Sequence, residues 1–265
     1  MPASTRRSFL LGALGGVALG GASGLLARSA SRLQPSVAVP VPTDSYAQQG
    51  EDLIVAEIFR KHLGIFLPSY VDIGAHEPVR GNNTYFFYTR GARGLLVEPN
   101  PFYADKLRKE RPGDAVLEAG IGPNEEDTLA DYYVIHGDGQ LNTFSKAQAD
   151  AIVKQQGPQA IERVTKVRLV NVNKALAEHF AAGAPDFLSV DTEGLDLDIL
   201  RSLDWSRFRP KVVCAETCKM DGTVDPDILE LMAARGYEVR GGTFVNTVFV
   251  DRQALAHAAP GVTGP

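Results

Sequence analysis

Cysteine is scarce in this sequence. The chain has 265 residues and two cysteines, Cys214 and Cys218. Both lie in the segment "KVVCAETCK", which begins with an apolar run typical of a buried strand. Four steps along a strand span roughly 13 Å, whereas the Cα atoms of a disulfide lie about 4.4–6.8 Å apart. We therefore predict two free thiols and a fold that does not depend on disulfides.

A surplus of positive charge is also missing. The chain carries 27 Lys and Arg against 32 Asp and Glu, a formal net charge of −5. The first 30 residues contain three arginines and no acid, so the rest of the chain is more acidic than the whole. Phosphate backbones bind to basic faces of proteins. The composition therefore argues against nucleic acid as a partner, while the hydrophobic content of 44% is that of an ordinary globular domain.

Residues 1–30 resemble a targeting segment rather than part of a fold. Arg6 and Arg7 precede an uncharged run, rich in Gly and Ala, over residues 8–27. This pattern is similar to a twin-arginine export signal, and it predicts export to the periplasm. Two alternatives stay open: a retained anchor that contacts the membrane through residues 8–27, or a cytoplasmic location.

One α/β domain is expected after this segment. Residues 31–44 contain three prolines and no periodic pattern, so we interpret them as a linker. The domain itself is expected over 45–253, with a flexible tail at 254–265. Short apolar runs alternate with helix-like segments, which favours a mostly parallel sheet with helices on both faces. The expected strands are 70–73, 94–100, 115–122, 186–191, 211–217 and two within 237–251, around a Gly-Gly bend, of which the last is antiparallel.

Helices are expected between these strands. Ser45 is a candidate N-cap for a helix to His62, and Asn82 or Asn83 for a second one. Residues 123–170 break the alternation with two further strands and a polar helix between them. The remaining expected helices are 101–111, 173–182, one that begins near 195, and 225–235.

Acids and glycines end the expected parallel strands. Ligands of open α/β sheets bind outside the carboxyl ends of the strands, so these residues are candidates for one site. The acids and glycines include Asp72, Gly74, Glu98, Gly120, Asp191, Glu193 and Glu216, and Asn100 follows Glu98 closely.

The strand-end pattern discriminates between cofactors. An acid that ends the second strand, here Glu98, accepts hydrogen bonds from ribose hydroxyls. The dinucleotide fingerprint G-x-G-x-x-G is missing, because Gly81 is the next glycine after Gly74. Glu77 lies between them, where a carboxylate would repel a pyrophosphate. The sequence therefore favours S-adenosylmethionine, a sulfonium without phosphate, with Gly74 letting the backbone approach its methionine part.

At this point the domain resembles the FkbM-type family of S-adenosylmethionine-dependent methyltransferases. The matching stretches run in family order over nearly all of residues 45–250: "SYAQQGEDLIVAEIF", "YVDIGAHEPVRGNNTYFFYTRGARGLLVEPNP", "LNTFSK", "DFLSVDTEGLDLDILRSLD", "RPKVVCAET" and "NTVFV". The resemblance implies an α/β fold of the class I methyltransferase (Rossmann-like) type, with a seven-stranded, mostly parallel sheet and an antiparallel last strand. It places Asp72, Gly74 and Glu98 at the cofactor and Asp191 at the rim that faces the reaction. Leu195 departs from the polar residue that many relatives have there.

We therefore predict a methyltransferase that uses S-adenosyl-L-methionine and acts on a small-molecule or glycan acceptor, as an O-methyltransferase of a sugar or secondary metabolite. The predicted cofactor-binding residues are Asp72, Gly74, Ala75, Glu98, Asn100 and Gly120. Asp191, Glu193 and His76 are the candidate catalytic residues, with His136 as a further possible base. No metal ligand is assigned, although Asp191 and Glu193 could hold a divalent cation. A non-catalytic cofactor-binding scaffold and an NAD-linked oxidoreductase are the alternatives, and the oligomeric state is left open.

Overall fold

The structure is a computed structural model that describes residues 44–137, 139–181, 183–219 and 222–258. The expected targeting segment at 1–30, and the expected linker up to residue 43, lie outside the described residues. Within the described ranges, no helix is both long and apolar enough to cross a membrane. Both cysteines are free thiols, as predicted, and Cys214 is buried.

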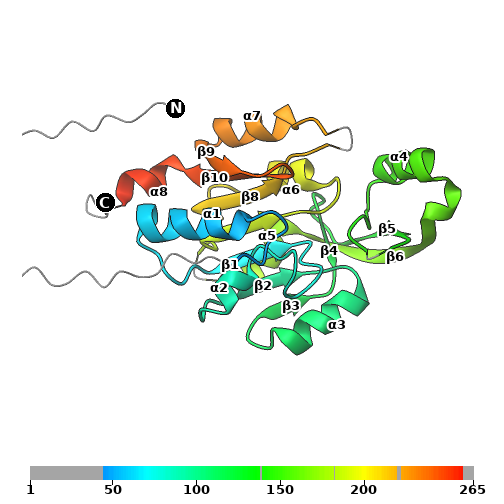
Figure 1. Cartoon of the computed structure of the whole chain (residues 1–265), viewed down its shortest axis with the longest axis horizontal. Coiled ribbons are helices and arrows are strands. Elements are labelled where there is room, and N and C mark those ends of the chain that lie inside the picture. The colour runs from blue at the N-terminus through cyan, green and yellow to red at the C-terminus, as the bar shows by residue number, and fades with distance from the viewer. Residues whose placement is uncertain (1–43, 138, 182, 220–221, 259–265) are drawn as a thin grey trace, which may run out of the picture. The chain divides into compact units, whose positions relative to one another are not determined.

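A seven-stranded sheet forms the centre of the domain, as predicted (Figure 1). The strand order is β3-β2-β1-β7-β8-β10-β9. β1 pairs in parallel with β2 on one side and with β7 on the other, while β10 runs antiparallel to β8 and β9. The strands are β1 (Tyr70–Ile73), β2 (Gly94–Val97), β3 (Ala115–Leu117), β7 (Phe187–Val190), β8 (Val212–Glu216), β9 (Tyr237–Gly242) and β10 (Asn246–Asp251).

Helices cover both faces of this sheet. Successive side chains of a strand point to opposite faces, and in β1 Tyr70 packs on one face while Val71 and Ile73 pack on the other. The Val71 face is covered by α5 (Val172–His179), α6 (Asp196–Ser202) and α7 (Pro226–Ala234). The Tyr70 face is covered by α1 (Glu51–Glu57), the π-helix η1 (Ile58–Leu63), α2 (Tyr85–Tyr88), α3 (Pro101–Glu110) and α8 (Arg252–His257).

Several boundaries differ from the predicted ones; β2, for example, ends at Val97 and not at residue 100, and α5 ends at His179 and not at residue 182. The first helix begins at Glu51 and not at Ser45, because the Ser45 hydroxyl and the Tyr46 N–H both donate to the Asp52 carboxylate, at 2.6 and 2.7 Å, and hold the preceding segment in a bend. The second helix begins after Thr84, although the Asn82 side chain does accept the Tyr85 N–H, at 2.8 Å.

Two further differences concern another strand and the tail. The single strand expected over 115–122 is two strands: β3 pairs with β2 in the main sheet, and β4 (Gly120–Gly122) pairs with β6 in another. The tail expected from residue 254 is helical as far as His257, since α8 occupies Arg252–His257 and Asp251 caps it by accepting the Gln253 N–H.

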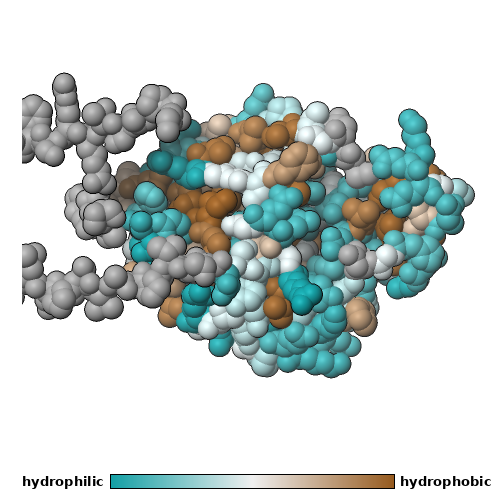
Figure 2. Space-filling model, viewed as in Figure 1, coloured by the Kyte–Doolittle hydropathy of each residue, from teal (hydrophilic) through white to brown (hydrophobic). Residues whose placement is uncertain are grey.

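A second sheet forms an arm beside the carboxyl ends of the main strands (Figure 1). Its order is β4-β6-β5, with β5 at Thr128–Ile135 and β6 at Ile161–Asn171. Between them lie α4 (Lys146–Gln156), which Ser145 caps, and the short 3₁₀-helix η2 (Pro158–Ala160). We call residues 128–171 the arm. Its surface is largely polar, with apolar residues among the polar ones (Figure 2).

Candidate functional site

The carboxyl ends of four strands and the beginning of a fifth, β4, meet the arm at one cavity of about 740 Å³. The strands are β1, β2, β4, β7 and β8, so the site lies where the chain order in the sheet reverses between β1 and β7. Its volume is within the range usual for small-molecule sites. Seven of the residues that the sequence offers as site candidates line this cavity: Gly74, His76, Glu98, Gly120, Asp191, Glu193 and Glu216.

Gly74 brings the β1 and β7 loops together. Its φ is +86°, and a Cβ atom there would lie 1.8 Å from the Asp191 carbonyl oxygen. An L side chain is excluded both by this overlap and by the left-handed backbone. The glycine therefore allows a close approach between two protein loops, which is a different reason from the predicted approach of backbone to ligand.

Glu98 is held rigidly at the end of β2. It is 3% exposed, and its two carboxylate oxygens accept the backbone N–H groups of His76 and Asn100 at 2.9 and 2.7 Å. Burial raises the pKa of Glu98 to about 7, although both hydrogen bonds oppose the rise. Each oxygen keeps a lone pair, so this carboxylate can accept hydrogen bonds from hydroxyls in the cavity.

Asp72, Ala75 and Asn100 are buried but do not line the cavity. The Ala75 N–H donates to the Val97 carbonyl, and the Asn100 side chain caps α3 by accepting the Phe102 N–H at 3.1 Å. These residues support the loops that follow β1 and β2. That any of the three touches the cofactor stays a prediction.

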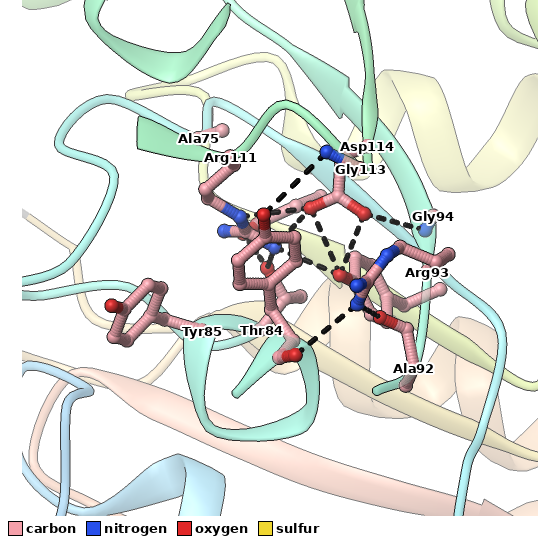
Figure 3. Close-up of polar contacts among 12 residues, drawn as sticks. Ala75, Thr84, Tyr85, Ala92, Arg93, Gly94, Arg111, Gly113 and Asp114 are labelled. Atoms are coloured by element: carbon pink, nitrogen blue, oxygen red, sulfur yellow. Dashed lines mark hydrogen bonds and ion pairs between the residues drawn. The ribbon is translucent and has the colours of Figure 1, made fainter. Parts of the chain in front are cut away.

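Arg111, Asp114 and Thr84 belong to a buried network of polar contacts (Figure 3), and Thr84 connects this network to Asp72. The Asp72 carboxylate accepts the Thr84 hydroxyl at 2.8 Å, and Thr84 accepts from Arg111 at 3.1 Å. Arg111 is fully buried and forms an ion pair with the equally buried Asp114 side chain, at 2.7 Å. Burial raises the pKa of Asp72, and the positive charge of Arg111 opposes the rise. The network thus connects β1 to α3 and to the loop before α2.

Three carboxyl groups form the floor of the cavity below β7 and β8. Asp191, Glu193 and Glu216 can each place a carboxylate oxygen within 4.8 Å of the others. Burial and the neighbouring Asp191 and Glu193 raise the pKa of Glu216 to about 10. Burial and Glu193 also raise the pKa of Asp191 well above its ordinary value. Such a set could hold a divalent cation or take up protons.

The arm fixes the third carboxyl group, Glu193. Its backbone is left-handed, with φ +55°, which is uncommon outside glycine. The Thr143 hydroxyl donates to the Glu193 carbonyl at 2.5 Å, and the Gln148 amide donates to Glu193 Oε2 at 2.6 Å. Burial and the nearby Asp196 raise the pKa of Glu193 to about 7, although the Gln148 hydrogen bond opposes the rise.

The two histidine candidates differ in position. His76 lines the cavity, with φ +46°, and its ring lies 4.0 Å from the Tyr103 ring, centroid to centroid. His136 is exposed at the end of β5 and does not line the cavity. The structure thus brings His76 to the site and leaves His136 outside it.

Sequence reasoning missed the contributions of the arm. Thr143 and Gln148 carry no motif of their own, and only the break in the strand–helix alternation signalled their segment. Glu216 is not among the predicted catalytic residues. Its position at the end of a parallel strand, which it shares with Asp72 and Glu98, could have indicated a catalytic role.

The charges of the cavity match the expected cofactor. Carboxyl groups dominate its floor, and the arginine and lysine side chains among the described lining residues, Arg80 and Lys219, are both exposed. A pyrophosphate would find no buried cation there, whereas a sulfonium and a ribose find carboxylates. Together with the strand order and the antiparallel β10, this site defines a class I methyltransferase.

The family comparison agrees with this class. The model of the methyltransferase FkbM domain matches residues 72–239, and the chain belongs to that family. The protein is accordingly an S-adenosylmethionine-dependent methyltransferase. No curated protein matches the chain in a sequence comparison.

Several solved methyltransferases have a similar chain trace. The TehB-like SAM-dependent methyltransferase of Corynebacterium glutamicum is 10% identical, covering 77% of this chain and 89% of its own, with a TM-score of 0.40. Methyltransferase FkbM of Methylobacillus flagellatus is 14% identical over 69% of this chain and 43% of its own, with a TM-score of 0.41. The O-methyltransferase of Bacillus cereus, solved in complex with S-adenosylhomocysteine, is 12% identical over 79% and 83%, with a TM-score of 0.38.

Proposed function

We propose that the enzyme methylates a hydroxyl group of a small-molecule or glycan acceptor, with Glu193 as the general base. The observation that carries this proposal is the position of Glu193: a carboxyl group on the cavity floor, fixed by two hydrogen bonds from the arm, with a pKa of about 7. A general base is most effective when its pKa lies near the working pH.

The cofactor half of the cavity is assigned to the carboxyl ends of β1 and β2 and to the beginning of β4. We infer that Glu98 accepts hydrogen bonds from the ribose hydroxyls of S-adenosylmethionine and that the Gly74 loop adjoins its methionine portion. Bound S-adenosylmethionine supplies an activated methyl group. The carboxyl groups of Asp191, Glu193 and Glu216 then lie on the acceptor side of the cavity, where β7 and β8 end.

Glu193 is a better base than its neighbours. Its Oε2 atom is held by Gln148, which leaves Oε1 to take the proton of the acceptor hydroxyl. Glu216, with a pKa of about 10, is protonated near neutral pH and suits hydrogen-bond donation to the acceptor. We assign Asp191 to orientation of the acceptor, and His76 lies on the cofactor side of the cavity, where its backbone N–H donates to Glu98.

Labelled S-adenosylmethionine and a panel of hydroxylated acceptors test this proposal. We expect a methyl ether, which keeps its label under mild alkali, whereas a methyl ester would release labelled methanol. Glu193→Gln should lower turnover by about 10²–10⁴-fold, while Glu125→Gln, at an exposed position, should leave it unchanged. Cofactor binding without transfer to any acceptor, or an equally active Glu193→Gln enzyme, would contradict the proposal.

We also propose that residues 1–30 direct export of the folded domain by the twin-arginine route. Arg6 and Arg7 before an uncharged run support it. Because S-adenosylmethionine is made inside the cell, the domain would bind it before export. A fused reporter that fluoresces only when it folds before export should reach the periplasm with the parent segment and stay inside with Arg6→Lys/Arg7→Lys. Unchanged localisation of the double variant would refute export by this route.

A further inference from the structure

The acceptor side of the cavity has apolar walls above its acidic floor. On the arm, Ala147 and Ala151 line the cavity one turn apart on α4, on the same face as Gln148. Since Gln148 contacts Glu193, this face of α4 adjoins the proposed base. A second wall contains the apolar residues Leu197 on α6, Ile228 on α7 and Val245 before β10, with the polar Thr217 and Asp225 beside them.

These walls are separate from the half assigned to the cofactor. Phe144, also on the arm, belongs to the other half, because a Cβ atom on Gly120 would lie 2.6 Å from its ring. Val245 instead adjoins the end of β8, where its carbonyl accepts the N–H groups of Thr217 and Cys218 at 3.0 Å. The apolar walls therefore flank the carboxyl groups of β7 and β8 on the acceptor side.

From this arrangement, which rests on the proposed function, we infer that the acceptor is amphipathic: its hydroxyl-bearing end meets the acidic floor, and an apolar alkyl or aryl portion lies between α4 and the α6–α7 wall. Alanine at 147 and 151 leaves room on the α4 wall on either side of Gln148. One helical turn between them is about 6 Å long at ~1.5 Å per residue, which is enough for a short alkyl chain or one aromatic ring.

The alternative acceptor class is a fully polar one, such as a free sugar. Such a molecule could bind the carboxyl groups, but any hydroxyl placed against the side chains of Ala151 or Ile228 would receive no hydrogen bond from them, which is costly. An alkyl or aryl glycoside, or another hydroxylated apolar metabolite, would bind the acidic floor through its hydroxyls and the apolar walls through its alkyl or aryl portion.

Two glucosides with the same head separate these classes. Dissociation constants of hexyl β-D-glucoside and methyl β-D-glucoside are measured by saturation-transfer NMR on the full chain saturated with S-adenosylhomocysteine. We expect hexyl glucoside to bind at least about tenfold more tightly, given the contribution of each buried methylene. Ala151→Asp should reduce its affinity to that of methyl glucoside, and Gln155→Asp, at an exposed position of the same helix, should not.

The outcomes distinguish this inference from the function on which it rests. Equal binding of the two glucosides, no binding of hexyl glucoside, or the same effect of both Asp variants, would overturn the amphipathic acceptor while S-adenosylhomocysteine still binds. Failure of S-adenosylhomocysteine itself to bind would instead overturn the proposed function.

Discussion

The raised pKa of Glu98 predicts that cofactor binding depends on pH. The pKa of this carboxyl group is about 7 in the free protein, because burial penalises its charge. Ribose hydroxyls donate to the carboxylate, so bound ligand favours the ionised form and lowers the pKa. Binding therefore releases a proton near neutral pH, and affinity for S-adenosylhomocysteine rises as the pH rises through 7.

The size of the effect follows from the ionised fraction. A group with pKa about 7 is roughly one-tenth ionised at pH 6 and nine-tenths ionised at pH 8. The dissociation constant should therefore fall about tenfold between these pH values, which is ~1.4 kcal/mol. Isothermal titration calorimetry over this range measures it directly, and titrations in two buffers of different ionisation enthalpy count the released proton.

Substitutions identify the group that titrates. Glu98→Gln should abolish the pH dependence and weaken binding at pH 8 by at least about tenfold, through loss of charge-assisted hydrogen bonds. Glu118→Gln removes the same charge from a partly exposed side chain after β3 and should keep the full dependence. A pH dependence in Glu98→Gln equal to that of the parent would refute the reasoning and point to another buried acid.

Three further predictions concern the floor, the arm and the supporting network. Asp191→Asn should lower turnover while the affinity for S-adenosylhomocysteine stays within a few-fold, because Asp191 lies on the acceptor side of the cavity; equal turnover would remove it from the reaction. Gln148→Ala removes a hydrogen bond that lowers the pKa of Glu193, so the acidic limb of the pH–rate profile should move to higher pH, and an unmoved limb would exclude Glu193 as the base. Arg111→Met leaves the Asp114 carboxylate buried without its ion-pair partner and should lower the free energy of unfolding by about 3–5 kcal/mol. Arg108→Met, on the surface, should lower it by less than about 1 kcal/mol. Urea denaturation measures both, and a similar cost for the two variants would contradict the buried network.

The local sequence pattern predicts most of the strands and helices, and it predicts the site residues that lie at the strand ends. Buried parallel strands read as continuous apolar runs, and the acids that end them, such as Glu98 and Asp191, mark the site because strand ends converge in this topology. The division of residues 115–122 into two strands arises because β3 pairs with β2 and β4 pairs with β6. The local sequence of the segment does not indicate these partners. The contact of Gln148 with Glu193 joins residues 45 positions apart, so only the folded arm reveals it.

The position of the cofactor is the central claim, and a crystal structure of the protein with S-adenosylhomocysteine tests it most directly. We predict ribose hydroxyls within hydrogen-bond distance of the Glu98 carboxylate, the homocysteine portion beside the Gly74 loop, and the sulfur atom facing the carboxyl groups of Asp191 and Glu193. A ligand bound outside this cavity, or one whose sulfur faces away from both carboxyl groups, would contradict the account.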